Sequence, residues 1–228
     1  MLPSNVTYIR IDSFSDRSLI DVRSVIQNYP SQQGLILDLR GNLGGTLPTA
    51  LDTASLFLRN GVDIMRLVTS FGAVEGKRKE QLHRSTNFRP MEVPLLILTD
   101  HRTASASEIL VAALHDNERC VVVGKRTLGK DVAQAVVTLS DGSGVALTVR
   151  VFRTPVGNLK MGDGLEPDLY LESVGDLNIN KIRYVPYGTG AGSNGCWFVD
   201  GIPVRRKRDF ELEGKRVTKN RLKLGLGD

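Results

Sequence analysis

The sequence predicts an α/β fold with a mostly parallel sheet, and three features of the chain lead to this expectation. Residues 6–11 alternate β-forming side chains, which is typical of a strand, and residues 16–28 place apolar side chains at helical spacing. Residues 34–39 are almost continuously apolar, the pattern of a parallel strand buried on both faces. Two more apolar runs, at 93–99 and 119–124, flank another amphipathic stretch. Strand, helix and buried strand in this order form a βαβ unit.

The remaining elements follow from the same periodicities and from turn residues. In chain order they are a helix over 47–59, a strand over 62–69, a polar hairpin or flap over 71–90, a helix from Ser105 to about Asn117, and a hairpin of strands 132–139 and 145–152 joined at Asp141-Gly142-Ser143-Gly144.

Composition indicates an ordinary soluble globular domain. The 228 residues are 41% hydrophobic and 24% charged, enough for one domain with a substantial core. The net charge of +5 lies in residues 204–228, which hold nine Lys or Arg against four Asp or Glu. Because the rest of the chain is neutral, we expect no nucleic-acid binding by the fold, although the basic tail could contact a polyanion.

Several classes of protein are not indicated. No run approaches the length of a membrane span, and the first residues lack the basic and apolar regions of an export signal. Cys120 and Cys196 lie far apart, in no spacing typical of a zinc site or a disulfide framework. We therefore expect neither a metal nor a cofactor.

Ser105 lies where an apolar strand turns into a helix through small residues. Its hydroxyl would sit at the amino end of that helix, where free backbone N–H groups and the helix dipole favour negative charge. This position suits a nucleophile in acyl transfer. The same residues also fit a capping box, in which Ser105 caps the helix and Glu108 reaches back to it.

Glycines follow the buried strand 34–39, in the segment Arg40-Gly41-Asn42-Leu43-Gly44-Gly45. Glycine permits unusual backbone torsions and brings bare N–H groups close to a ligand, so the loop fits an oxyanion hole or a phosphate cradle. It also fits a simple tight turn. It is not a P-loop, because no Gly-Lys-Ser or Gly-Lys-Thr follows.

Lys130 lies at the end of the glycine-bounded loop 124–130, where the chain enters the predicted hairpin. A lysine in this position often faces solvent. Gln134 is four residues further on, about 13 Å along an extended strand but on the same face. The two side chains could therefore touch only by leaning together or across a bend.

Three motifs in this order, at 35–45, 103–117 and 124–134, resemble those of the carboxyl-terminal processing, or tail-specific, proteases. The resemblance extends from about Val6 to Asp168, where a Gly-x-Gly-x-x-Pro-Asp motif falls on 162–168. It implies a crotonase/Clp-protease-like core of ββα-type units with mostly parallel buried strands. It also implies a serine endopeptidase acting on the C-terminal tails of proteins.

The resemblance also implies a role for each matching residue. These are Ser105 as nucleophile, Lys130 as general base, Gln134 as the residue that orients the lysine, the N–H of Gly44 or Gly45 with that of Ala106 as oxyanion hole, Glu108 as site organiser and Asp116 as a supporting residue. A serine needs a base within hydrogen-bond reach, and lysine is a base only when uncharged.

Family members usually carry a PDZ domain before this core. We therefore expect residues 1–173 to be a catalytic core without its PDZ domain, either a fragment or a reduced form. Residues 174–228 would then be an extension with a Gly-rich linker and the basic tail. Relatives act in the bacterial periplasm or thylakoid lumen, which suggests such a compartment by resemblance only.

Three alternatives remain. A histidine-based triad is disfavoured because His115 lies ten residues along the helix from Ser105, about 15 Å away. The same fold could serve as a non-catalytic module that binds peptides or apolar ligands. It could also be a crotonase-type acyl-CoA enzyme, in which paired N–H groups hold an enolate. Neither of the last two needs both Ser105 and Lys130.

Overall fold

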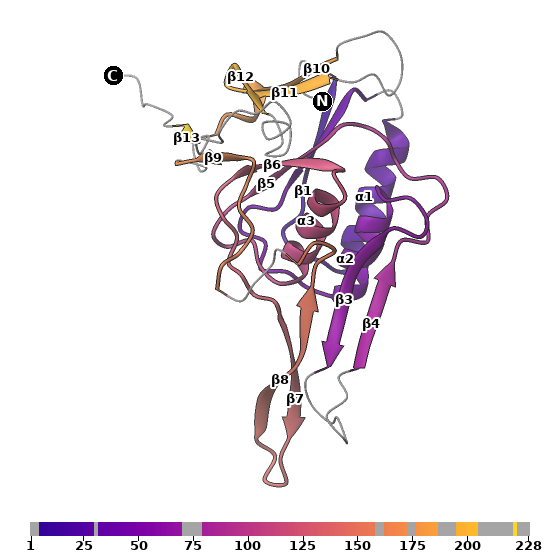
Figure 1. The fold of residues 1–228 in the computed structure, drawn as a ribbon, viewed down its shortest axis with the longest axis vertical. Helices are drawn as coiled ribbons and strands as arrows, with labels where there is room; N and C mark the ends of the chain where they lie inside the picture. The colour runs from indigo at the N-terminus through magenta and orange to yellow at the C-terminus, as the bar shows by residue number, and fades with distance from the viewer. Residues whose placement is uncertain are drawn as a thin grey trace.

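The structure is a computed structural model. It describes residues 5–29, 32–69, 79–157, 162–172, 177–186, 195–204 and 221–222. Three sheets and three α-helices make up this part of the chain (Figure 1). Within the described residues, no helix is both long enough and apolar enough to cross a bilayer.

A six-stranded parallel sheet forms the centre of the molecule. Its strands lie in the order β1 (Val6–Arg10), β2 (Gly34–Asp38), β5 (Leu95–Thr99), β6 (Cys120–Gly124), β9 (Leu169–Leu171) and β13 (Arg221–Leu222). All neighbouring pairs are parallel, and the strands cross the sheet in chain order. The predicted α/β fold with buried parallel strands is therefore confirmed.

The helices cover one face of this sheet. They are α1 (Asp16–Asn28), α2 (Leu47–Ser55) and α3 (Ala106–Asp116). Side chains alternate along each strand, so Leu35 and Leu37 of β2 pack with the helices while Ile36 points to the opposite face. The described helix α2 ends at Ser55, four residues before the predicted end.

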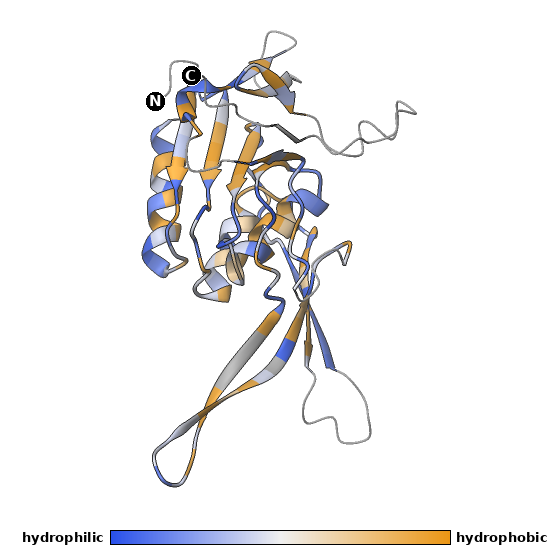
Figure 2. Cartoon of the chain, turned by 90° about the vertical axis from the view of Figure 1, so that its left-hand side faces the viewer, coloured by the Kyte–Doolittle hydropathy of each residue, from blue (hydrophilic) through white to orange (hydrophobic). Residues whose placement is uncertain are grey.

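A four-stranded antiparallel sheet, in the order β4-β3-β8-β7, projects from the body (Figures 1 and 2). Its strands are β3 (Asp63–Thr69), β4 (Lys79–Arg84), β7 (Val132–Thr138) and β8 (Gly144–Arg153). The predicted β7–β8 hairpin is confirmed. Part of the predicted flap, β4, pairs with β3, and residues 70–78 lie outside the described residues.

A small antiparallel sheet follows the central sheet in the chain and covers its second face. After the short 3-10 helix η2 (Ile179–Lys181) it is formed by β10 (Ile182–Pro186), β11 (Gly195–Val199) and β12 (Ile202–Val204). Trp197 and Tyr184 of this sheet are buried with Ile36 and Leu96 of the central sheet. The sequence did not predict these strands.

The predicted linker and tail fall mostly outside the described residues, which omit 187–194, 205–220 and 223–228. Gly195, expected in the linker, begins β11. Of the basic tail, Arg221–Leu222 is described as β13, which extends the edge of the central sheet beside β9.

Candidate active site

Ser105 lies at the turn from β5 into α3, as predicted, and its backbone is strained. Its φ of 58° and ψ of −120° are values that residues other than glycine rarely adopt. A strained strand-to-helix turn is also the device by which other hydrolases present a nucleophile. The side chain is half-buried at the amino end of a helix whose first N–H groups have no partner within the helix.

Glu108 is the residue that connects the predicted site. Its side chain is fully buried, and its Oε2 accepts hydrogen bonds from the N–H of Ser105 at 2.9 Å and of Lys130 at 2.8 Å. Its Oε1 accepts from the N–H of Gly129 at 2.6 Å and the hydroxyl of Thr127 at 2.5 Å. Because both N–H groups donate to the same oxygen, the backbone nitrogens of Ser105 and Lys130 lie close together.

The Lys130 side chain is exposed. Among the described residues, its amine and the Ser105 hydroxyl make no hydrogen bond with each other. The structure thus brings together the backbones of the two residues through Glu108.

Gln134 lies in β7, opposite Thr148 of β8. The β7–β8 register shifts between Ala133 and Gln134, so the strand has an irregularity close to Gln134. The Gln134 side chain lies outside the described part of the chain.

The glycine loop lies directly against Ser105. A Cβ atom added to Gly44, whose φ is +109°, would be 3.0 Å from the Cβ of Ser105 and 3.1 Å from the nitrogen of Ala106. The Gly44 N–H already donates to the side chain of Asn42 at 2.8 Å. No hydrogen bond from the Gly45 N–H is found within the described residues. At position 44, both the positive φ and the close approach of Ser105 and Ala106 favour glycine.

Three further residues brace these loops and were not singled out from the sequence. Asp100 Oδ1 accepts from the N–H groups of Gly41 and Thr103, both at 3.0 Å, and so joins the glycine loop to the turn before Ser105. Thr103 donates its hydroxyl to the carbonyl of Leu39 at 2.9 Å. Asn42 binds both loops as well. The bonds of Asp100 to Gly41 and of Thr103 to Leu39 join residues about 60 positions apart, which local sequence patterns cannot reveal.

A charged cluster lies at the ends of β1 and β2. The fully buried Asp38 accepts from Arg40 Nη2 at 2.5 Å and from the Tyr8 hydroxyl at 2.6 Å. Burial alone would raise the pKa of Asp38, but the hydrogen bonds from Arg40 and Tyr8 outweigh it and lower the pKa from its ordinary value. Burial, then the hydrogen bond to Asp38, raises the pKa of Tyr8.

Asp116 lies at the far end of α3 from Ser105 and accepts from the N–H of Val156 at 3.0 Å. Its neighbour His115 contacts Asp168 through Nε2 at 3.2 Å. Both contacts attach the carboxyl end of α3 to later segments. The supporting role of Asp116 in the site stays a prediction.

The glycine motif at 162–168 packs against the loop that carries Lys130. The Gly162 N–H donates to the carbonyl of Gly129 at 2.9 Å, and the Leu165 N–H donates to the hydroxyl of Thr127 at 2.8 Å. A Cβ on Gly129 would lie 2.6 Å from the nitrogen of Gly164. This motif therefore fixes the path of the chain into Lys130.

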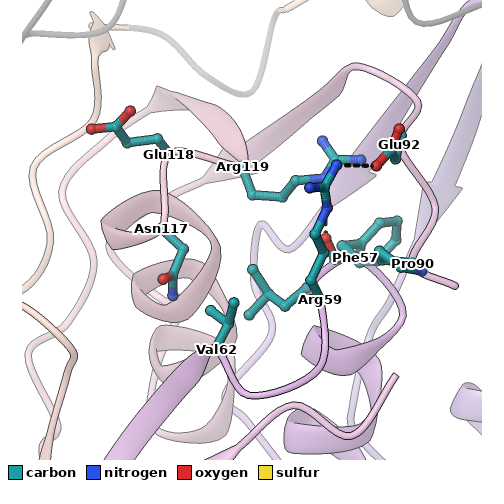
Figure 3. A pocket seen from close by; sticks show the side chains of 9 residues that line it. Phe57, Arg59, Val62, Pro90, Glu92, Asn117, Glu118 and Arg119 are labelled. Carbon is teal, nitrogen blue, oxygen red and sulfur yellow. Dashed lines mark hydrogen bonds and ion pairs between the residues drawn. The ribbon is translucent and has the colours of Figure 1, made fainter. Parts of the chain in front are cut away.

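A separate pocket lies beyond the carboxyl end of α3, lined in part by Asn117, Arg119, Phe57 and Glu92 (Figure 3). Arg119 donates to the carbonyls of Met91 at 2.7 Å and Val93 at 2.6 Å. Burial lowers the pKa of Arg119. Because this guanidinium is occupied by backbone carbonyls, it acts as a brace between loops.

The fold and the site together define an α/β protein that presents a serine on a strained turn, beside a glycine loop and a loop ending in lysine. Comparison with known proteins specifies the family. The profile of peptidase family S41 matches residues 5–171, and the chain belongs to this family.

Curated relatives agree with this assignment. The chloroplastic C-terminal processing peptidase of Tetradesmus obliquus is 35% identical over 167 residues, which is 72% of this chain and 35% of that protein. The carboxy-terminal processing protease CtpA of Bacillus subtilis is 33% identical over 174 residues, 75% of this chain and 36% of that protein. The chain thus spans about a third of the length of these relatives.

Solved structures share the fold. The photosystem II D1 C-terminal processing protease is 33% identical, with a TM-score of 0.63 over 72% of this chain and 42% of that one. A putative S41 protease from Bacteroides fragilis has a TM-score of 0.60 at 20% identity, over 72% of this chain and 46% of that one. The predicted Clp-protease-like fold and the predicted family are both confirmed.

Proposed function

We propose that this chain is the catalytic core of a serine endopeptidase that cleaves proteins near their C-termini. The observation that carries the proposal is the buried Glu108 carboxylate, which holds the backbones of Ser105 and Lys130 side by side. Family membership and the names of the relatives support the reaction type and the protein substrate.

In this mechanism Ser105 is the nucleophile and Lys130, uncharged, is the general base. The Lys130 amine takes the hydroxyl proton as Ser105 Oγ bonds to the peptide carbonyl carbon. The C–N bond then breaks, and the ammonium of Lys130 returns the proton to the leaving amine. Water, activated by the same amine, hydrolyses the acyl-enzyme ester. Gln134 would accept from the amine and orient it.

The N–H groups of Gly45 and Ala106 are the proposed oxyanion donors. The Gly44 N–H is already used by Asn42, which leaves Gly45 from the predicted pair. Ala106 is the first residue of α3, so its N–H has no partner within the helix. Preorganised backbone donors of this kind are the main source of stabilisation in acyl transfer.

The mechanism requires the Lys130 side chain to turn toward Ser105. Its backbone is already anchored beside that of Ser105, so only rotation about side-chain bonds is needed. Exposed side chains change rotamer within nanoseconds, far faster than catalysis.

The test is labelling by a fluorophosphonate probe, together with hydrolysis of an unstructured peptide. We expect the wild-type protein to be labelled at Ser105. Ser105→Ala and Lys130→Ala should each lower hydrolysis at least about 1,000-fold. Lys125→Ala, a lysine in the same loop, is the matched control and should retain activity. Labelling that is absent in the wild type, or unchanged in Lys130→Ala, would contradict the mechanism.

One observation favours a second candidate, a non-catalytic peptide-binding module. Such a module does not need a hydrogen bond between the Lys130 amine and the Ser105 hydroxyl, and the described residues show none. It would bind peptides with the same affinity in wild type and Ser105→Ala, and hydrolyse none. The labelling experiment distinguishes the two functions.

The compartment and partners follow from the same proposal. The relatives include chloroplastic proteins and a cyanobacterial one, which supports a thylakoid-lumen or periplasmic setting. The partners would be protein tails, and the basic tail could in addition contact a polyanion.

A further inference from the structure

Asn42 is a fully buried asparagine in the glycine loop, and its hydrogen bonds join three segments. Its Nδ2 donates to the carbonyl of Ile11 at 2.8 Å, and its Oδ1 accepts from the N–H of Gly44 at 2.8 Å. Its main-chain carbonyl accepts from the N–H of Ala104 at 3.0 Å and the hydroxyl of Ser107 at 3.2 Å. Burying so polar a residue is costly unless its groups are paired, and here they are.

The first pair of bonds holds the Leu43–Gly44 peptide, which directly precedes the peptide that carries the Gly45 N–H. Asn42 holds the N–H of Gly44, while the carbonyl of Gly44 accepts from the N–H of Phe14 at 2.9 Å. In a trans peptide the C=O and the following N–H point in opposite directions. The Gly45 N–H therefore points away from Phe14 and is free to bind an oxyanion.

The second pair of bonds acts on the other side of the site. Ala104 and Ser107 flank Ser105 and Ala106, which carry the nucleophile and the second oxyanion donor. Because one carbonyl binds both flanking residues, the turn is held at two points by the same residue that holds the Gly44 N–H, one peptide before that of Gly45. Asn42 is thus the shared anchor of both donors.

We propose that Asn42 is a positioning residue that sets the Gly45 and Ala106 N–H groups at the spacing required by the tetrahedral intermediate. The inference rests on the proposed peptidase function and extends it. It predicts that replacing Asn42 lowers the reaction rate by more than the loss of folding stability explains. Small displacements of catalytic groups are known to cost about 100-fold in rate.

The experiment compares Asn42→Ala and Asn42→Asp with the wild type and with Asn117→Ala. Asn117 is a matched control, because it also bridges two carbonyls, those of Asp63 at 2.9 Å and Ala113 at 2.7 Å, but at the far end of α3. In Asn42→Asp, Gly44 keeps its acceptor while an oxygen replaces the donor to Ile11. For each protein we would measure kcat and KM on a peptide, inhibition by a peptide aldehyde, and the melting temperature.

We expect Asn42→Ala to lower kcat about 10- to 100-fold with little change in KM, and to weaken aldehyde inhibition by a similar factor. The aldehyde forms a tetrahedral adduct on Ser105, so its binding reports on the oxyanion donors directly. Asn42→Asp should show a smaller loss of the same kind. Asn117→Ala should lower the melting temperature without changing kcat.

Two results would overturn the inference. One is an unchanged kcat in Asn42 variants that fold. The other is a loss of kcat no larger than that of Asn117→Ala when both variants are equally destabilised. If Asn42→Ala does not fold, Asn42→Asp decides, and failure of both to fold would assign Asn42 to stability alone. A wild-type protein that is not labelled at Ser105 would instead refute the proposed function, and this inference with it.

Discussion

At the scale of single residues, Glu108 shows how one side chain can serve both fold and site. A capping box would need only the bonds between Ser105 and Glu108. Glu108 also binds Thr127, Gly129 and Lys130, which lie about 20 residues later. The capping interpretation and the functional one are therefore compatible, because the carboxylate that caps α3 also anchors the lysine loop.

Gly45 gives a prediction at this scale. A Cβ there would lie 2.2 Å from the carbonyl oxygen of Phe14, at a φ of +143°. Gly61, at φ +85°, is the matched control, because a Cβ added to it would meet nothing within 4 Å. Gly61→Ala should cost only torsional strain, about 1–2 kcal/mol. Gly45→Ala should cost more and also slow Ser105 labelling, as measured by urea unfolding and probe kinetics.

Equal losses of stability in the two variants would show that Phe14 and the glycine loop can move apart at little cost in free energy. Unchanged labelling in Gly45→Ala would show that the loop can shift without disturbing the site. Either result would contradict the view that the glycine loop is fixed by its neighbours.

The residues that could be predicted from the sequence are those with a local signature. Ser105 and Glu108 lie three positions apart at a helix start, and the two glycines lie between a strand and a helix. Asn42 has no such signature, because its partner Ile11 is 31 residues away. Its role depends on the parallel packing of β1 and β2, which brings the ends of these strands together.

At the scale of elements, the ends of β1 and β2 share one charge cluster. The depressed pKa of Asp38 means that the folded state releases this proton more readily than the unfolded chain. Its contribution to stability is therefore present above the ordinary value of 3.8 and is lost as the pH falls through and below it. Tyr8, whose pKa is raised, stabilises the fold below the ordinary value of 10.0. This contribution to stability is lost as the pH rises beyond that value.

Asp38→Asn should therefore lower the free energy of unfolding at neutral pH and flatten its decrease in acid. Asn keeps one acceptor for Arg40 but removes the charge, so the loss should be about 1–3 kcal/mol. Asp12→Asn is the control, since Asp12 pairs with Arg10 while 80% of its side chain is exposed. Denaturant titrations at several pH values measure both. If stability fell equally steeply with decreasing pH in the wild type and in Asp38→Asn, the stabilising role of the Asp38 charge would be contradicted.

The elements that were predicted well from the sequence are those in which apolar side chains recur with a strong periodicity. α1 begins and ends where expected, and the buried parallel strands agree closely with the apolar runs. β10 and β12 were missed because they contain Pro186 and Pro203, and β11 because it follows the glycine-rich segment 187–194. The burial of these antiparallel strands also depends on the sheet that they cover, which a local pattern does not show.

At the scale of the whole molecule, the central sheet separates two hydrophobic clusters. The helices bury one face, and the β10–β12 sheet buries the other. The family match ends at residue 171, whereas the second cluster includes Leu177, Tyr184 and Trp197 beyond it. Residues on both sides of the predicted boundary at 173 therefore contribute to one core.

Trp197 makes this arrangement testable, because it is the only tryptophan in the chain. It is buried against the central sheet, with its ring 2.7 Å from where a Cβ on Gly34 would lie and 5.3 Å from the ring of Tyr184. If the small sheet is part of one cooperative core, Trp197 fluorescence and far-UV circular dichroism should report the same urea midpoint. Trp197→Ala should lower the midpoint of circular dichroism by an amount equivalent to about 3–5 kcal/mol. A fluorescence transition at lower urea than the loss of helix would show instead that β10–β12 detaches first and that the central sheet and its helices are stable without it.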